Sequence, residues 1–134
     1  MEINYVKIVV TVILAVVGWI IGHYFTERRN RINKRREISL DHLISAYRIL
    51  TQDITHREWN ADSRLKFEKV ISEIQLFGTK EQVQISINII KEFAKKRTVD
   101  LDILINSLRN DLRNQLDLDK IDGNVFHLRT KDNE

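Results

Sequence analysis

The sequence VKIVVTVILAVVGWIIGHYF at residues 6–25 is followed directly by TERRNRINKRR at residues 26–36. From Ile8 to Tyr24 no residue carries a formal charge, and the stretch is long enough for an α-helix to cross the hydrocarbon core of a bilayer. Tyr5 and Tyr24 would lie about 28 Å apart along such a helix, which places an aromatic residue at each interface. The pattern predicts a transmembrane helix over residues 6–25, preceded by a short extracytoplasmic N-terminus at residues 1–5.

Two other kinds of segment share this apolar character. A cleaved signal peptide carries its positive charge before a shorter apolar stretch and ends in small residues, whereas here the charge follows the stretch and His23, Tyr24 and Phe25 offer no such cleavage site. A buried core helix is the second alternative, and the cluster of basic residues at its end argues against it. We therefore favour a membrane span.

The basic residues after the span predict its direction. Residues 26–37 form a basic juxtamembrane collar, expected to be helical, with six cationic side chains: Arg28, Arg29, Arg31, Lys34, Arg35 and Arg36. Because positive charge concentrates on the cytoplasmic side of a span, we expect the N-terminus outside the cell and the rest of the chain in the cytoplasm, anchored in the inner membrane. The collar would also attract anionic lipid headgroups.

The charge distribution explains the basic composition without nucleic acid. The chain has 22 basic and 19 acidic residues, and residues 1–37 hold seven of the former and three of the latter. The remaining 15 basic and 16 acidic residues leave the rest of the chain near neutrality, so we expect no nucleic-acid partner. The chain contains no cysteine, which suits a reducing compartment.

Small residues recur along one face of the predicted span. Thr11, Ala15, Gly18 and Gly22 follow a 4-3-4 spacing, and the last two form a GxxxG pattern that allows two helices to approach closely in lipid. This face predicts association with another transmembrane helix, in a second copy of the chain or in a protein partner.

Residues 38–118 show the periodicity of a small all-α domain of about four helices. The first apolar stripe comprises Leu40, Leu43, Ile44, Tyr47, Leu50 and Ile54, which is short for a coiled coil and favours packing onto later helices. A connection over residues 56–63 precedes a helix over residues 64–77, capped by Asp62 or Ser63. That helix is expected to bury Leu65, Phe67, Val70, Ile71, Ile74 and Phe77.

A helix corner is predicted at Gly78, Thr79 and Gln82. Gly78 would end one helix in the left-handed conformation, and Thr79 and Gln82 match the capping box that starts the next.

The third helix would pack through Val83, Ile87, Ile90, Phe93 and Ala94, or lie on the membrane surface instead. Thr98 or Asp100 would cap the fourth helix, whose apolar face runs from Leu101 to Leu116. Residues 119–134 are expected to form a flexible tail.

Two stretches, residues 74–79 (IQLFGT) and residues 108–113 (LRNDLR), resemble a pattern in small bacterial single-pass membrane proteins with a cytoplasmic helical domain. The resemblance covers roughly residues 60–120. It implies a bacterial helical module and brings no chemistry with it.

No motif in the sequence indicates catalysis. The four histidines lack metal-ligand spacing, and the acidic run from Asp117 to Gly123 departs from a calcium loop because Ile121 occupies a ligand position. We expect no cofactor and no metal.

These features predict a non-enzymatic membrane protein whose helical domain binds proteins as an adaptor, scaffold or regulatory subunit. The alternative is a membrane-active effector or small toxin that oligomerises through its span. A membrane-tethered nuclease using Arg36 and His42 is a more distant hypothesis.

Overall fold

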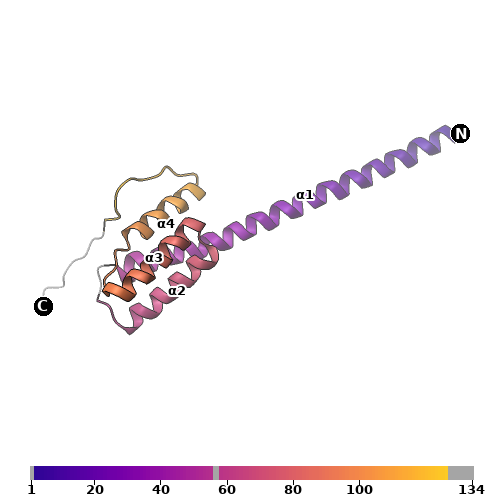
Figure 1. Cartoon of the computed structure of the whole chain (residues 1–134). Helices are drawn as coiled ribbons and strands as arrows, with labels where there is room; N and C mark the ends of the chain where they lie inside the picture. Colours follow the sequence, from indigo (N-terminus) through magenta and orange to yellow (C-terminus); the bar gives the residue numbers. More distant parts are fainter. Residues whose placement is uncertain (1, 56–57, 127–134) are drawn as a thin grey trace. The chain divides into compact units, whose positions relative to one another are not determined.

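A computed structural model describes residues 2–55 and 58–126 of the chain. The described residues form four α-helices and one π-helical segment and contain no strand, which confirms the predicted all-α class. The elements are α1 (Glu2–Arg48), η1 (Ile49–Ile54), α2 (Ala61–Phe77), α3 (Lys80–Lys96) and α4 (Asp102–Gln115), shown in Figure 1.

The chain divides into two compact units, residues 1–38 and residues 39–134. The first unit, as far as it is described, is the N-terminal part of α1. The second contains the end of α1, η1 and the three later helices. Within this second unit α2 packs on η1 and α3, and α3 packs on α4.

The core of the second unit draws side chains from all its helices. Its members are Leu43, Ala46, Leu50, Ile54, Phe67, Val70, Ile71, Ile74, Ile89, Leu104, Ile105, Leu108 and Leu112. Each fully buried aliphatic side chain contributes roughly 1.5–3 kcal/mol to folding. The stripe predicted at the end of α1 therefore packs onto the later helices, as expected.

The start of α2 differs from the prediction of Asp62 or Ser63 as its cap. Asn60 is the N-cap, and its side chain accepts a hydrogen bond of 2.8 Å from the Ser63 amide. Ser63 is buried inside the first turn and donates its hydroxyl to the carbonyl of Glu58. The prediction was wrong because three residues within four positions, Asn60, Asp62 and Ser63, all have cap-forming side chains.

Gly78 does not adopt the predicted left-handed conformation. Its φ of −72° and ψ of 164° are extended, a conformation open to any residue. Glycine is needed there for space, because a Cβ at this position would lie 2.5 Å from the carbonyl oxygen of Ile74.

The predicted capping box does form at the start of α3. The backbone N–H of Gln82 donates to Thr79 Oγ1 at 3.2 Å, and the backbone N–H of Thr79 donates to Gln82 Oε1 at 3.0 Å.

The buried face of α3 was predicted correctly only in part, since Val83, Ile87 and Phe93 are half-buried as expected. Ile90 and Ala94 are exposed, whereas Gln82, Ser86 and Ile89 are buried. The polar pair can be buried because each finds a hydrogen-bond partner: Gln82 in the capping box and Ser86 through its hydroxyl, which donates to the Val83 carbonyl at 2.7 Å. Leu65 of α2, also expected in the core, is exposed.

The π-helical segment η1 has no counterpart in the prediction. At its end the Thr55 amide donates to the Leu50 carbonyl, five residues back, at 3.0 Å. The buried Thr55 hydroxyl donates to the same oxygen at 2.6 Å. The wide turn is thus closed by a side chain as well as by the backbone.

The chain around α4 also departs from the pattern. The N-cap of α4 is Leu101, although Asp100 accepts a hydrogen bond from the Asp102 amide at 2.8 Å. Leu116, expected on the buried face, is exposed. Hydrogen bonds from α4 hold residues 119–124 of the predicted tail, and residues 127–134 lie outside the described part of the chain.

Replacing Gly78 with alanine should lower the free energy of unfolding by about 1–3 kcal/mol, because the new methyl group must displace the Ile74 carbonyl or the Gln82 side chain. Urea unfolding of the full chain in detergent, followed by circular dichroism, measures this. Ser72→Ala on the exposed side of α2 is the control and should change stability by less than about 0.5 kcal/mol. Equal stability of the two variants would contradict the close approach at Gly78.

Candidate functional site

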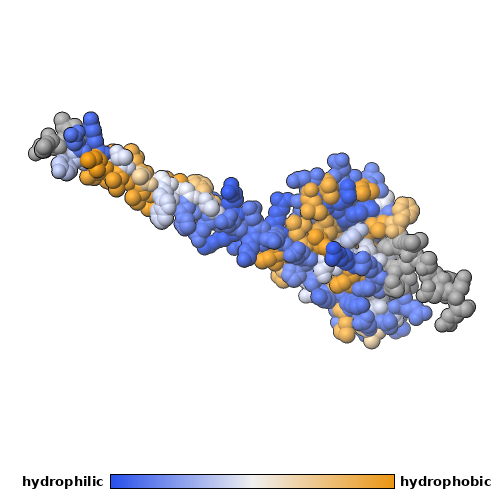
Figure 2. All heavy atoms as spheres, turned by 180° about the vertical axis from the view of Figure 1, so that it is seen from behind, coloured by the Kyte–Doolittle hydropathy of each residue, from blue (hydrophilic) through white to orange (hydrophobic). Residues whose placement is uncertain are grey.

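The N-terminal part of α1 has an exposed apolar surface. One helix near the N-terminus is long and apolar enough to cross a membrane, and none of its most apolar window is buried in the structure. Even large side chains there are about half exposed or more, from 46% for Val17 to 69% for Trp19. Figure 2 shows this surface as a mainly apolar band with a hydrophilic stretch beside it. The segment therefore lacks a packing partner among the described residues.

The four small residues of α1 lie on one helical face. At 100° per residue Thr11, Ala15, Gly18 and Gly22 fall within an arc of about 60°. Apart from the adjacent residues and the backbone of the helix itself, no heavy atom of the described residues lies within 4 Å of a Cβ built at either glycine, so the face is open. The Thr11 hydroxyl donates to the Lys7 carbonyl at 2.8 Å, which satisfies this polar group within the helix.

The six cationic collar residues all lie on α1 and are exposed. Arg28 and Arg36 are eight residues apart, so the collar occupies about 12 Å of helix length. Its side chains leave the helix in several directions and do not converge on one point. This arrangement suits diffuse attraction to a charged surface better than chelation of a single anion.

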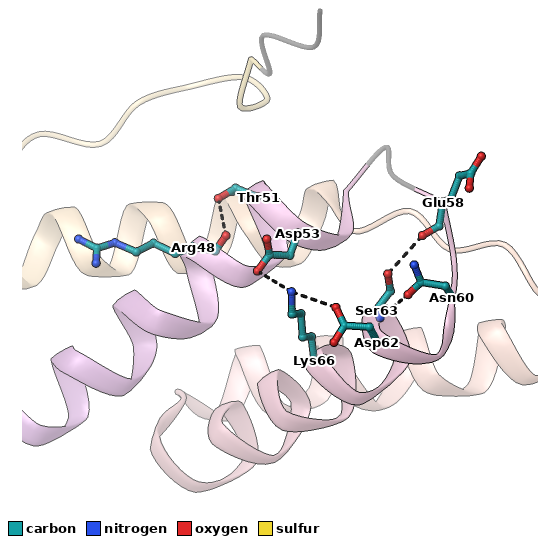
Figure 3. A network of polar contacts seen from close by, with 8 residues as sticks. All are labelled: Arg48, Thr51, Asp53, Glu58, Asn60, Asp62, Ser63 and Lys66. Atoms are coloured by element: carbon teal, nitrogen blue, oxygen red, sulfur yellow. Dashed lines mark hydrogen bonds and ion pairs between the residues drawn. The ribbon is translucent and has the colours of Figure 1, made fainter. Parts of the chain in front are cut away.

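The second unit holds an ionic contact that the sequence did not indicate. Lys66 Nζ of α2 lies 3.1 Å from Asp62 Oδ2 and 3.6 Å from Asp53 Oδ2 of η1 (Figure 3). The hydrogen bond that Lys66 donates to Asp62, and then the negative charge of Asp53, raise the pKa of Lys66 above its ordinary value of 10.5. This contact joins η1 to the first turns of α2.

An aromatic pocket of about 290 Å³ lies where η1, the connection before α2, and the link between α3 and α4 meet. We call it the Trp59 pocket. The Trp59 ring centroid is 5.7 Å from that of Phe67 and 5.1 Å from that of Phe93. The remaining lining residues are Ile54, Thr55, Arg97, Thr98, Val99, Asp100, Leu101 and Asp102.

A second hollow lies against the same aromatic residues. This hollow, of about 270 Å³, is lined by all three aromatic residues together with Arg64, Glu68, Ile71 and Ile90. Trp59 is 45% exposed and Ile90 is 41% exposed, so the surface is both apolar and accessible within the described residues. Sequence reasoning missed it because Trp59 belongs to a connection and its ring partners were assigned to the core. The feature of the sequence that indicated this pocket was a tryptophan in the connection between two predicted helices.

The helix corner contributes structure and no reactive group. Gln82 is fully buried, and its side-chain Nε2 donates to Asp111 Oδ2 of α4 at 3.2 Å. The capping box thereby also joins α3 to α4. Its polar atoms are used in hydrogen bonds that hold the fold.

His42 has packing contacts. Its ring stacks on Phe77 with centroids 4.4 Å apart, and Nδ1 lies 3.6 Å from Glu73 Oε1. No group of three or more potential metal-ligating residues occurs in the described ranges 2–55 and 58–126.

Comparison with known proteins returned no match of any kind: no family model, no curated protein and no solved structure corresponds to this chain. The resemblance to bacterial single-pass membrane proteins stays a prediction.

Replacing Lys66 with methionine should remove a pH-dependent part of the stability. Because the folded pKa is raised, the contribution of the charged amine is fully present below about pH 10.5 and is lost as the pH rises through the folded pKa. The stability difference between wild type and Lys66→Met, from urea unfolding at a series of pH values, should stay constant from pH 7 to 10 and then shrink.

The matched control is Gln75→Met, at an exposed position of the same helix. Its difference from wild type should not change over this pH range. A Lys66 difference that is equally flat above pH 10.5 would rule out the ionic contact.

Proposed function

We propose that the chain is a single-pass protein of the cytoplasmic membrane, with its N-terminus outside and a non-enzymatic helical interaction domain in the cytoplasm. The domain would serve as an adaptor, scaffold or regulatory subunit. The observation that carries the proposal is the apolar part of α1, which is helical over its whole length and unburied in the described chain.

A bilayer is the environment that best suits this segment. Eleven strongly apolar residues between Ile8 and Phe25 would each gain roughly 0.3–0.6 kcal/mol on insertion, about 3–6 kcal/mol together. The helical backbone satisfies its own hydrogen-bonding groups, as the hydrocarbon region requires. A core helix would be buried by its own domain, whereas this window is not. A signal peptide would carry its positive charge before the apolar stretch.

The collar supports the proposed orientation. Six exposed cations follow the apolar segment within three helical turns, whereas residues 1–7 contain one basic residue, Lys7. Anionic lipids of the cytoplasmic leaflet would attract the collar.

The interaction role is supported by how the second unit uses its side chains. Its buried polar residues are used in hydrogen bonds that hold the fold: those of Ser63 and Gln82 at the starts of α2 and α3, and that of Ser86 within α3. The accessible Trp59 pocket offers aromatic contact area of the kind that dominates protein interfaces.

A membrane-active effector that oligomerises through its span is the second candidate. The open face of Thr11, Ala15, Gly18 and Gly22 favours it. A water-filled pore would need more polar side chains, and Thr11 is the polar residue on that face, so the anchored interaction domain is the better supported of the two.

Topology can be tested with paired C-terminal reporters, one active only in the cytoplasm and one only outside. The wild type should activate the cytoplasmic reporter and resist carbonate extraction from membranes. Changing all six collar cations to glutamine should give mixed or inverted topology, because the charge bias then disappears.

Changing six cations of the second unit instead, Lys69, Lys80, Lys91, Lys95, Lys96 and Lys120, is the matched control and should leave topology unchanged. Extraction of the wild type by carbonate would refute the membrane proposal itself. Activity of the outside reporter in the wild type would refute only the orientation.

Self-association of the span can be tested with Gly18→Ile combined with Gly22→Ile in a membrane dimerisation assay. The added side chains would separate the backbones, so the signal should fall to background. Val9→Ile with Val16→Ile alters the opposite face of α1 and should leave the signal intact. An unchanged signal in the glycine double variant would exclude this face as the contact.

A further inference from the structure

Phe126 is a large apolar side chain with no cover in the structure. Its exposure is 101%, higher than that of any other large hydrophobic residue described. Val125 directly before it is partly buried and packs against the core. Exposing a phenyl ring to water is unfavourable, and aromatic rings gain further from contact with other rings.

The chain that carries Phe126 is guided along α4. Arg113 Nε donates to the carbonyl of Asp119 at 2.6 Å, and Arg109 Nη2 donates to the carbonyls of Ile121 and Gly123 at 2.8 and 2.6 Å. The attachment points step from Arg113 back to Arg109 as the segment advances. The segment therefore runs antiparallel to α4, toward the N-terminal end of that helix.

The final attachment lies at the rim of the Trp59 pocket. Asn124 Nδ2 donates to Asp102 Oδ2 at 3.1 Å, and Asn106 Nδ2 donates to Asn124 Oδ1 at 2.8 Å. Asp102 is itself a lining residue of the pocket. Two residues of extended chain span about 7 Å, so Phe126 lies within reach of the residues beside Asp102.

The pocket is large enough for the ring and has the right chemistry. Its volume of about 290 Å³ exceeds the roughly 150 Å³ of an engineered apolar cavity that binds benzene. Trp59, Phe67 and Phe93 line it. An entering phenyl ring could meet them at the 4.5–7 Å separations that aromatic pairs prefer.

We propose that Phe126 is the internal occupant of the Trp59 pocket, so that the C-terminal segment closes this interaction surface from within the same chain. The C-terminal segment then has two arrangements. In the open one, described above, Phe126 lies outside the pocket, and in the closed one its ring fills the pocket. The hydrogen bonds that Arg109 and Arg113 donate, and the one that Asp102 accepts from Asn124, are compatible with both arrangements. Closing therefore orders little beyond Phe126 itself. This inference does not depend on where the apolar part of α1 resides.

Acrylamide quenching of Trp59 tests the proposal in the full chain. Trp19→Phe leaves Trp59 as the only tryptophan, and the protein is studied in detergent. In this background Phe126→Ala should raise the quenching constant of Trp59 at least twofold, because the ring that shields it is gone. Phe126→Tyr keeps the ring and should retain most of the protection.

Leu118→Ala is the matched control, since it also removes an exposed apolar side chain from the C-terminal segment. It should leave quenching unchanged. Circular dichroism verifies that each variant keeps its helical content. A quenching constant that is the same with phenylalanine and alanine at position 126, whether high or low, would overturn the proposal.

Discussion

The later helices form a domain because they pack on one buried apolar stripe, which comprises Leu43, Ala46, Leu50 and Ile54. These side chains come from the last turns of α1 and from η1, and their exposed fractions are 6% or less. Without them α2 would lose its packing on η1 and keep its contact with α3. The stripe also explains why the domain begins near residue 39, since residues 4–38 of α1 are exposed. The same helix thus supplies a core at one end and an uncovered apolar surface at the other.

The features that were predictable from sequence are those with a strong local signal. The apolar segment over residues 6–25, the stripe of Leu43 and Leu50, and the Thr79–Gln82 capping box each follow from spacing alone. In each case the residue types permit few alternative arrangements. The all-α class followed from the same periodicity.

The features that escaped prediction depend on contacts between distant residues or on competition between neighbours. Gln82 and Ser86 are buried because their hydrogen bonds are satisfied, which a hydropathy pattern does not register. Gly78 is required by the close approach of the Ile74 carbonyl. A structural role for this glycine was correctly predicted, but its left-handed conformation was not. The Trp59 pocket is lined by residues from four separate segments between positions 54 and 102. No periodicity in the sequence indicates that these segments meet.

The π-helical winding of η1 makes the chain unusually sensitive to its own length at that point. Such a segment accommodates one residue more per turn than the α-helix beside it. Removal of a single residue between Ile49 and Ile54 would restore ordinary winding and turn the residues that follow by roughly 100° about the helix axis. Ile54 and Thr55 would then leave their buried positions. Insertions and deletions should consequently be tolerated far less in η1 than in the exposed collar. Related sequences should therefore differ in length in the collar and agree in length across η1.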